Sequence, residues 1–477
     1  MSYDADLKLF IDGSWRSGED RERFAVVNPA DAKPIAELPL ATDADLDEAL
    51  AAAERTFPLW RATDVEKRGA ILRKAAELLR ERADAIGRLM TQEQGKPFVE
   101  ARGEVLASAG LLDWYAEEIK RDYGRLLVRP TGQRAMVLHQ PVGPVATFTP
   151  WNFPLYLLAK KAAAALAAGC SVISKPPEET PGCTQALAKA LEDAGLPKGV
   201  FQIVHGVPDH VSRRIIASPV IRKVSFTGST AIGKHLMRLA ADGVKRITLE
   251  LGGHAPVLVF DDCDLEKTLD MVVQQKFRNA GQVCVSPTRF YVQAGIYEAF
   301  ARGFAERTGK VKLGNGLDAD TKMGPLAHQR RPEAIARLVE DARAKGARVL
   351  AGGEPGDAGY FYKPTVLADV PLDAEVMSQE PFGPVALMRP FDTFDEAIEQ
   401  ANRLPFGLAA FAFTENGRFA RLPFSVKAKA ARPKGRRLAC SIASSNVSNG
   451  RIKATGPNGS SFITSASSGT SASTVGL

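Results

Sequence analysis

The stretch "PVATFTPWNFPLYLLAKKAAAALAAGCSVISKP", residues 144–176, decides the fold. It predicts an apolar strand over 144–150, a helix over 155–169 that Gly169 stops, and a second strand over 170–176 that Pro176 ends. The same alternation continues along the chain, with helices expected over 184–195, 209–218 and 231–243 and strands over 201–206, 223–228 and 246–253. Repeated strand, helix and strand units predict a parallel sheet covered by helices.

The regions on either side extend this pattern. Residues 45–90 repeat apolar positions at intervals of three and four, which predicts helices. A second alternating series follows Gly252 and continues to about residue 420. We therefore expect an α/β protein with two doubly wound parallel-sheet domains, because 477 residues exceed what one core normally holds. Ligands of such sheets bind at the carboxyl ends of the strands, so functional residues are expected there.

Composition excludes several classes of protein. The chain is 45% hydrophobic and 25% charged, which is typical of a globular protein. Its five cysteines, at positions 170, 183, 263, 284 and 440, are too scattered for a disulfide framework or a zinc site. No apolar run of about 18 residues and no secretory signal pattern occurs. We therefore expect a cytoplasmic protein without a bound metal or a membrane segment.

The net charge of +7 comes from one end of the chain. Residues 418–477 contain ten Lys and Arg and no Asp or Glu, so residues 1–417 carry a net charge of −3. After Arg421 there are also twelve serines, no Tyr or Trp, and no clear periodicity. This basic, serine-rich tail, residues 421–477, has the composition of an irregular or disordered segment.

Cys284, in "NAGQVCVSP" at residues 279–287, is the strongest candidate for a reactive residue. Most buried cysteines only pack. Here, however, small residues and Gly281 precede the cysteine, so backbone N–H groups could approach a substrate oxygen, and a thiolate attacks carbonyl carbons. Cys170, Cys183 and Cys263 lack such a loop and are interpreted as structural.

Two motifs around Cys284 resemble those of the aldehyde dehydrogenase superfamily. The family's cysteine motif, Phe-x-Asn-x-Gly-Gln-x-Cys, matches residues 277–284, and its Glu-Leu-Gly-Gly motif matches residues 250–253. The segments "TPWNFP" at 149–154, "FTGSTAIG" at 226–233 and "EPFGP" at 380–384 also fit, and the resemblance spans about 7 to about 420. It implies a cofactor-binding domain over 1–121 and 142–249, bridging strands over 122–141, and a catalytic domain over 250–420.

The resemblance implies a role for three catalytic residues. Cys284 would attack the aldehyde carbon to form a thiohemiacetal, and Asn152 with the Cys284 backbone N–H would stabilise the oxyanion. Transfer of hydride to NAD would leave a thioester, and Glu250 would activate water to hydrolyse it. Taken alone, Glu250 would be interpreted as a solvated carboxylate at a strand end.

The resemblance also identifies cofactor residues at the strand ends. A carboxylate at Glu178 can bind both ribose hydroxyls and would repel a 2′-phosphate, which favours NAD over NADP. Taken singly, Lys175 and Glu178 would be surface charges, and 228–233 is a turn that opens a helix suited to a pyrophosphate. The full set is Thr149, Pro150, Trp151, Lys175, Glu178, Gly228, Ser229, Gly233, Leu251, Glu380 and Phe382.

For the substrate, the sequence is most similar to the succinate-semialdehyde dehydrogenase branch. Arg278, six residues before Cys284, would pair with a substrate carboxylate, and Lys160 occupies the place of a second arginine. Other semialdehydes or aliphatic aldehydes remain alternatives. The family also implies a homo-oligomer, a dimer or tetramer, joined through the bridging strands.

The basic, serine-rich tail departs from the family, because the expected closing strand does not appear after Arg421. A shifted reading frame would explain this. A basic extension that binds nucleic acid is less favoured, since such an extension would more often interleave aromatic residues or repeat a motif. A chain without the family's ending should expose strand edges, so we expect poor solubility, impaired assembly and weak turnover. A binding-only relative without catalysis is a further alternative.

Overall fold

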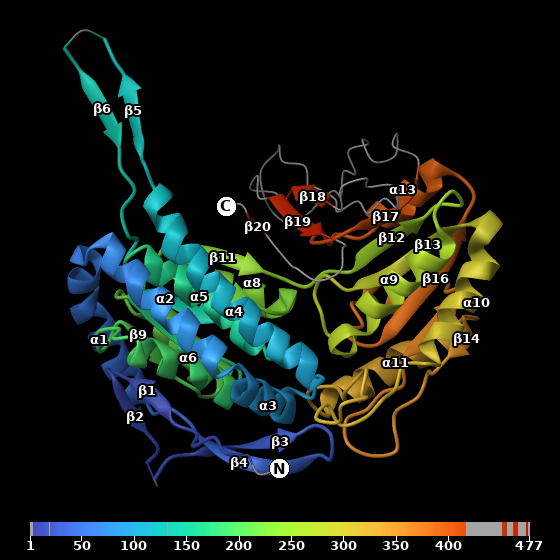
Figure 1. The fold of residues 1–477 in the computed structure, drawn as a ribbon, viewed down its shortest axis with the longest axis horizontal. Coiled ribbons are helices and arrows are strands. Elements are labelled where there is room, and N and C mark those ends of the chain that lie inside the picture. The colour runs from blue at the N-terminus through green and yellow to red at the C-terminus, as the bar shows by residue number, and fades with distance from the viewer. Residues whose placement is uncertain are drawn as a thin grey trace. The chain divides into compact units, whose positions relative to one another are not determined.

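The computed structural model describes residues 3–18, 20–130 and 132–415, together with three strands at 451–455, 461–465 and 474–475. It divides into two compact units. Unit 1 comprises Met1–Leu251 and Asn315–Ala319, and unit 2 comprises Gly252–Gly314 and Asp320–Leu477. Each unit contains one large sheet with helices packed against it, which confirms the expected α/β fold (Figure 1).

Unit 1 is built on a seven-stranded sheet of order β11-β10-β7-β8-β9-β1-β2. Five strands are parallel, whereas β1 pairs antiparallel with both β9 and β2, so the sheet is mixed rather than wholly parallel. The strands are β1 (Leu9–Ile11), β2 (Ser14–Arg16), β7 (Val145–Phe148), β8 (Val172–Lys175), β9 (Phe201–Ile203), β10 (Lys223–Thr227) and β11 (Arg246–Glu250).

Helices cover both faces of this sheet. Residues that alternate along a strand point to opposite faces, so Val172 joins the core under α2, α4, α5 and α6 while Ile173 joins the core under α1, α7 and α8. The helices are α1 (Asp43–Ala62), α2 (Val65–Glu81), α3 (Ala83–Gln94), α4 (Phe98–Glu118), α5 (Pro154–Ala167), α6 (Pro181–Asp193), α7 (Pro208–Ala217) and α8 (Thr230–Asp242), with a 3₁₀ turn, η1, at Ile119–Arg121.

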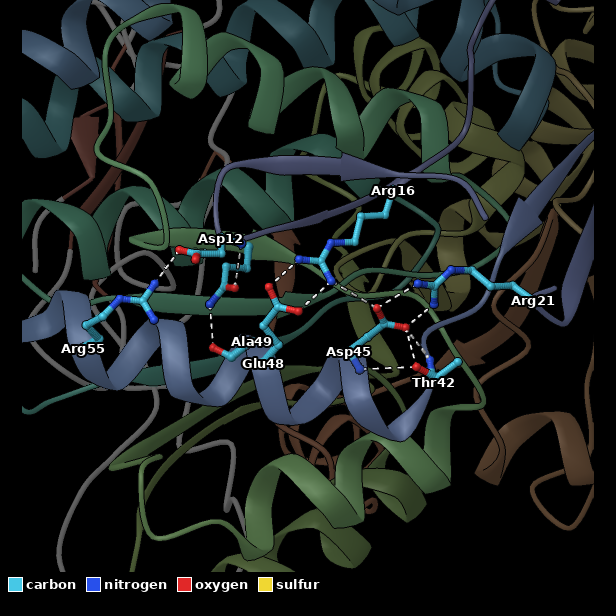
Figure 2. Close-up of polar contacts among 9 residues, drawn as sticks. Asp12, Arg16, Arg21, Thr42, Asp45, Glu48, Ala49 and Arg55 are labelled. Atoms are coloured by element: carbon cyan, nitrogen blue, oxygen red, sulfur yellow. Dashed lines mark hydrogen bonds and ion pairs between the residues drawn. The ribbon is translucent and has the colours of Figure 1, made fainter. Parts of the chain in front are cut away.

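The amino-terminal hairpin of unit 1 is fastened to α1 by charged side chains (Figure 2). Arg21 binds the buried carboxylate of Asp45 through both of its terminal nitrogens, and Arg16 binds Glu48 one turn further along the helix. Asp45 also completes a capping box with Thr42 at the start of α1. These contacts fix the β1–β2 edge of the sheet on the helix.

Two further hairpins belong to unit 1, and both are antiparallel. The first pairs β3 (Arg23–Asn28) with β4 (Lys33–Pro39), and the second pairs β5 (Arg125–Val128) with β6 (Arg134–Val137) inside the segment expected to form bridging strands. The β5–β6 hairpin projects away from the helices of unit 1 (Figure 1). Leu126 and Met136 face each other across it and are 70% and 71% exposed.

Unit 2 is built on a six-stranded sheet of order β14-β15-β16-β13-β12-β17, parallel except for β14. Its strands are β12 (Ala255–Val259), β13 (Pro287–Gln293), β14 (Arg348–Ala351), β15 (Thr365–Ala368), β16 (Val385–Phe391) and β17 (Phe411–Phe413). One apolar core joins this sheet to its helices. The helices are α9 (Leu265–Phe277), α10 (Tyr297–Thr308), α11 (Arg330–Ala344), α12 (Glu375–Ser378) and α13 (Phe394–Asn402), with 3₁₀ turns η2 at Arg278–Gly281 and η3 at Ala294–Ile296.

Within the basic, serine-rich tail, three strands form a separate antiparallel sheet: β18 (Arg451–Thr455), β19 (Ser461–Ser465) and β20 (Thr474–Val475). The expectation of irregular structure for the rest of that tail lies outside the described residues. Among the residues that are described, no helix is both long and apolar enough to span a membrane. The same residues contain no group of His, Cys, Asp or Glu suited to a metal ion.

Candidate active site

In unit 1, the expected cofactor residues follow the carboxyl ends of neighbouring parallel strands. Thr149, Pro150, Trp151 and Asn152 follow β7, and Thr149 donates its backbone N–H to the carbonyl of Lys175 at the end of β8. Lys175 and Glu178 are not surface charges. Both side chains are buried, their charged atoms lie 2.5 Å apart, and Glu178 also accepts the Gly206 N–H at 3.2 Å.

This edge of the sheet carries polar groups suited to a dinucleotide. The hydroxyls of Thr149 and Thr227, after β7 and at the end of β10, are buried and have no hydrogen-bond partner within the described part of the chain. Buried polar groups normally find a partner, and a ligand can supply one. Next to Thr227, Ser229 caps α8 by accepting the Ile232 N–H at 3.4 Å, which leaves a helix amino terminus of the kind that binds phosphate. The residues therefore fit a nicotinamide dinucleotide.

Glu250 ends β11, directly beside this turn. It pairs in register with Thr227, and its backbone carbonyl accepts the Gly228 N–H at 3.1 Å. Gly233, in the first turn of α8, leaves room for Leu251, because an ideal Cβ there would lie 2.4 Å from the Leu251 Cδ2. The Glu250 side chain itself is exposed. Unit 1 thus places Gly228, Gly233, Glu250 and Leu251 close together.

Two consecutive lysines on α5 differ in their surroundings. Lys160, the expected substrate residue, is half-buried. Lys161 was not singled out from the sequence, yet its Nζ donates to Ser225 Oγ at 3.1 Å. Burial lowers the pKa of Lys161 to about 8, the charge of Glu250 acts in the opposite direction, and Lys160 and Lys223 lower the pKa further. Lys161 is therefore a titratable neighbour of Glu250.

In unit 2, Cys284 follows a turn of unusual backbone conformation. Asn279, Ala280 and Gly281 all have positive φ, at 49°, 51° and 70°. Non-glycine residues rarely adopt this region, so the surroundings must hold the turn. The Asn279 side-chain amide donates to the Gln282 carbonyl at 3.3 Å, and Gln282 Nε2 donates back to the Asn279 carbonyl at 3.1 Å. These bonds explain why the turn before Cys284 carries Asn and Gln.

Gly281 has a packing role that the sequence did not indicate. An ideal Cβ on it would lie 2.1 Å from the Gly383 carbonyl oxygen. The expectation that this glycine lets backbone N–H groups approach a substrate stays a prediction. Gly253 has a similar role, because a Cβ there would lie 2.8 Å from the Cys284 carbonyl oxygen. Both glycines therefore allow close packing of backbone around Cys284, which is itself half-buried.

The segment from Glu380 to Gly383 lies against the same glycines. Glu380 accepts the Gly253 N–H at 3.3 Å. Burial raises the pKa of the Glu380 carboxyl to about 7, although the Gly253 N–H, Arg331 and Lys276 each act to lower it. Arg331 donates to the Pro381 carbonyl at 2.5 Å and to the Phe382 carbonyl at 3.2 Å, and Phe382 has a φ of 43°. Arg331 therefore braces a strained turn.

Lys276 and Arg278 stand at the end of α9 and the start of the cysteine turn. Lys276 is 1% exposed and donates to Ser286 Oγ at 3.1 Å, on the other side of Cys284 in sequence. Burial lowers its pKa to about 7, and the charge of Glu380 opposes this shift. Arg278 is exposed. Lys276 and Arg331 were missed because a helical lysine and an arginine in "QRRPEA" look like surface charges in the sequence.

The predicted site residues thus form two groups, one in each unit. Unit 1 holds Asn152, Glu250, Lys160 and the cofactor residues from Thr149 to Leu251, and unit 2 holds Arg278, Cys284, Glu380 and Phe382. The residues of unit 1 lie mainly at the ends of its parallel strands, and those of unit 2 lie in the tight turns around Cys284 and Glu380.

Comparison with known proteins shows the family of the chain. The chain is 50% identical over 412 residues to the 4-(hydroxymethyl)benzenesulfonate dehydrogenase TsaD1 of Comamonas testosteroni, covering 86% of each chain. It is 42% identical over 411 residues to the NADP-dependent succinate-semialdehyde dehydrogenase GabD of Escherichia coli, covering 86% of this chain and 85% of that protein. The crystal structure of an aldehyde dehydrogenase from Brucella melitensis biovar abortus matches with a TM-score of 0.86 and 40% identity, covering 95% and 92% of the two chains. Because the sequence profile of the aldehyde dehydrogenase family also matches residues 15–424, the chain belongs to that family of NAD(P)-dependent enzymes.

Proposed function

We propose that this enzyme oxidises an aldehyde that carries a carboxylate or sulfonate group to the corresponding acid. The observation that carries the proposal is the position of Arg278, an exposed residue that lies six residues before Cys284 in the same unit. A guanidinium binds either anion through paired hydrogen bonds. The relatives support this class, since one is named for a benzenesulfonate and the other for succinate semialdehyde, and both substrates are anionic.

The catalytic roles follow from what each side chain can do. The Cys284 thiolate forms a C–S bond with the aldehyde carbon, and the carbonyl oxygen takes the negative charge. The Asn152 side-chain N–H and the Cys284 backbone N–H stabilise that oxyanion, and losing one such donor typically costs about 3 to 4 kcal/mol of transition-state stabilisation. Glu250 then removes a proton from the water that breaks the C–S bond of the thioester, which releases the acid and restores the thiolate.

We propose NAD rather than NADP as the cofactor. A bound nicotinamide would supply the hydride acceptor, and loss of hydride from the thiohemiacetal carbon would leave the thioester. Lys175 and Glu178 would hold the adenosine ribose, the turn at Gly228, Ser229 and Gly233 the pyrophosphate, and Glu380 with Phe382 the nicotinamide ribose. The carboxylate of Glu178 favours NAD because a 2′-phosphate beside a buried carboxylate would be repelled. The 2′-phosphate of NADP would also have to compete with Glu178 for Lys175, because these two side chains already form an ion pair.

The test is NADH formation at 340 nm with succinate semialdehyde, 4-formylbenzenesulfonate and benzaldehyde, which carries no anionic group. We expect turnover of the two anionic aldehydes to be lost in Cys284→Ser. Arg278→Met should raise KM for both anionic aldehydes by about tenfold or more, because a charge-assisted pair contributes about 1.5 to 3 kcal/mol, and should leave benzaldehyde unchanged. An equal effect of Arg278→Met on benzaldehyde would rule out anion recognition by this residue.

We further propose that copies of the chain associate through the β5–β6 hairpin, in a homo-oligomer that the departure of residues 421–477 from the family is expected to weaken. Leu126, Val128 and Met136 are 70%, 99% and 71% exposed, and the hairpin that carries them projects away from the helices of unit 1 (Figure 1). Exposed apolar side chains clustered on a two-stranded hairpin mark a protein contact. Light scattering should show an oligomer for the unaltered protein and a smaller species for Leu126→Lys with Met136→Lys. Unchanged mass in that double variant would contradict the role of the hairpin.

A further inference from the structure

A buried ion pair lies beneath the segment that carries Asn152. Lys96 Nζ lies 2.6 Å from Glu104 Oε2, and the two side chains are only 1% and 2% exposed. Burial of two charges costs free energy unless their remaining hydrogen-bonding capacity is satisfied. Lys96 and Glu104 satisfy their remaining hydrogen-bonding capacity through contacts with residues 152–156. We therefore expect the ion pair to fix the position of this segment.

Glu104 replaces the missing cap of α5. The helix has no side-chain cap at its first residue, and Pro154 has no N–H to satisfy. The first two N–H groups of the helix, on Leu155 and Tyr156, both donate to Glu104 Oε1 at 3.1 Å. A carboxylate at this position also complements the positive end of the helix dipole. Glu104 therefore fixes where α5 begins.

Lys96 holds the residues just before the helix. Its Nζ donates to the backbone carbonyl of Asn152 at 2.8 Å and lies 4.2 Å from the centre of the Phe153 ring. The backbone of Lys96 is fixed by the turn after α3, where Gly95 has a φ of 95° and the Lys96 backbone N–H donates to Gln94 Oε1 at 3.0 Å. Gly316 packs on this turn, because a Cβ there would lie 2.5 Å from the Lys96 carbonyl oxygen.

We propose that the Lys96–Glu104 pair is the positioning device for the Asn152 side chain. The lysine fixes the carbonyl of Asn152, and the glutamate fixes the helix that starts two residues later. The ion pair links these two restraints to each other. This inference rests on the proposed role of Asn152 as an oxyanion donor. A displacement of about 1 Å in such a donor can reduce the rate on the order of 100-fold, so Lys96 and Glu104 act on kcat without touching the substrate.

The sharpest test is a double-mutant cycle. Lys96→Met together with Glu104→Gln removes both charges and leaves no buried charge unpaired, while Gln can still accept the Leu155 and Tyr156 N–H groups. We expect kcat with succinate semialdehyde to fall by between about tenfold and 100-fold, with KM for NAD within about twofold of the unaltered value. In an Asn152→Ala background the same pair of substitutions should cause no further loss in kcat. Full additivity of the two losses would overturn the positioning role.

The control is Arg68→Gln. Arg68 is also a buried cation, and it binds α5 at the opposite end by donating to the Ala167 carbonyl at 3.0 Å. Its loss should lower Tm but leave the kcat per folded enzyme within about twofold, whereas loss of the Lys96–Glu104 pair should change kcat. An equal loss of kcat in Arg68→Gln would show a general effect on α5 and would contradict the proposal.

A second measurement separates this inference from the proposed function. Hydrogen exchange of the peptide over 152–160 should speed up in Lys96→Met and stay unchanged in Arg68→Gln. If Asn152→Ala alone leaves kcat unchanged, the oxyanion role is wrong, and the exchange data still decide whether Lys96 fixes the segment. Unchanged exchange in Lys96→Met would overturn the inference even if Asn152 proves essential.

Discussion

Gly281 packs directly on the backbone of Gly383, so that an ideal Cβ at position 281 would lie 2.1 Å from the Gly383 carbonyl oxygen. The φ of Gly281 is also positive, at 70°. Gly281→Ala must therefore displace backbone within the turn that carries Cys284. We expect kcat to fall by about 100-fold or more, and the rate of alkylation of Cys284 by iodoacetamide to change with it.

Gly295→Ala is the matched control for that substitution. It lies in the same unit, and an ideal Cβ there meets no atom of the described structure within 4 Å. We expect it to retain kcat and Tm. If Gly281→Ala behaved like this control, the close packing around Cys284 would not matter for catalysis.

Arg331→Gln should weaken cofactor binding more than it lowers stability. The arginine donates to the carbonyls of Pro381 and Phe382, directly after the proposed ribose residue Glu380, and Phe382 has a strained φ of 43°. Losing hydrogen bonds from a charged donor costs about 1.5 to 3 kcal/mol, so KM for NAD should rise by about tenfold or more. Arg343→Gln, on the same helix but paired with the exposed Glu340, is the control. An unchanged KM in Arg331→Gln would exclude the bracing role.

The strands of unit 1 could be predicted because periodicity is a local property. The alternation of apolar strands and helices over 144–253 located β7, β8, β10 and β11 and gave the general expectation that ligands bind at their carboxyl ends. The choice of Thr149, Lys175 and Glu250 at those ends came from the resemblance to the aldehyde dehydrogenase family. The sequence could not show that Lys175 and Glu178 are buried. Their burial depends on contacts between separate segments, such as the hydrogen bond from the Gly206 N–H to Glu178, and no local pattern encodes those contacts.

The supporting residues escaped prediction for a related reason. Lys96 and Glu104 stand eight residues apart in a polar sequence, and Arg331 lies in a run of charges, so each resembles a solvated side chain. Their partners are the backbone carbonyls and N–H groups of Asn152, Leu155 and Pro381, and a backbone partner leaves no trace in the sequence. The positive φ of Ala280 is likewise imposed by packing rather than by residue type.

Cofactor binding should depend on pH through Glu380. Burial raises the pKa of this carboxyl from 4.5 to about 7, so in the folded protein it becomes a full acceptor for ribose hydroxyls only above neutrality. The groups that face it are Lys276, Arg331 and the Gly253 N–H, and all three favour its ionised form. We expect KM for NAD to fall as pH rises from 6 to 8, and Glu380→Gln to remove this dependence. The same KM profile in Glu380→Gln would assign the pH dependence to another group.

The same shift predicts how stability varies with pH. Because the pKa of Glu380 is higher in the folded chain than in the unfolded one, the folded state holds an extra proton between pH 4.5 and about 7. The stability that this extra proton gives the folded state is fully present below pH 4.5 and is lost as pH rises towards 7. Relative to Glu380→Gln, the unaltered protein should therefore lose free energy of unfolding across that window, as measured by urea titration at several pH values. If the free energy of unfolding changed equally with pH in both proteins, Glu380 would not be the source of the pH dependence.

Glu178→Ser should change the choice between NAD and NADP. Glu178 Oε1 lies 2.5 Å from Lys175 Nζ, and both side chains are buried, so the carboxylate would face any 2′-phosphate on the adenosine ribose and also neutralises the cation that could bind it. The substitution removes the repulsion and releases the lysine, and a charge-assisted contact of about 1.5 to 3 kcal/mol corresponds to about tenfold or more in binding. We therefore expect kcat/KM to rise for NADP and to fall for NAD. Each cofactor serves as the control for the other, since a general loss of folding would lower both values together. If the unaltered enzyme already used NADP better than NAD, the buried carboxylate would not be the residue that selects the cofactor.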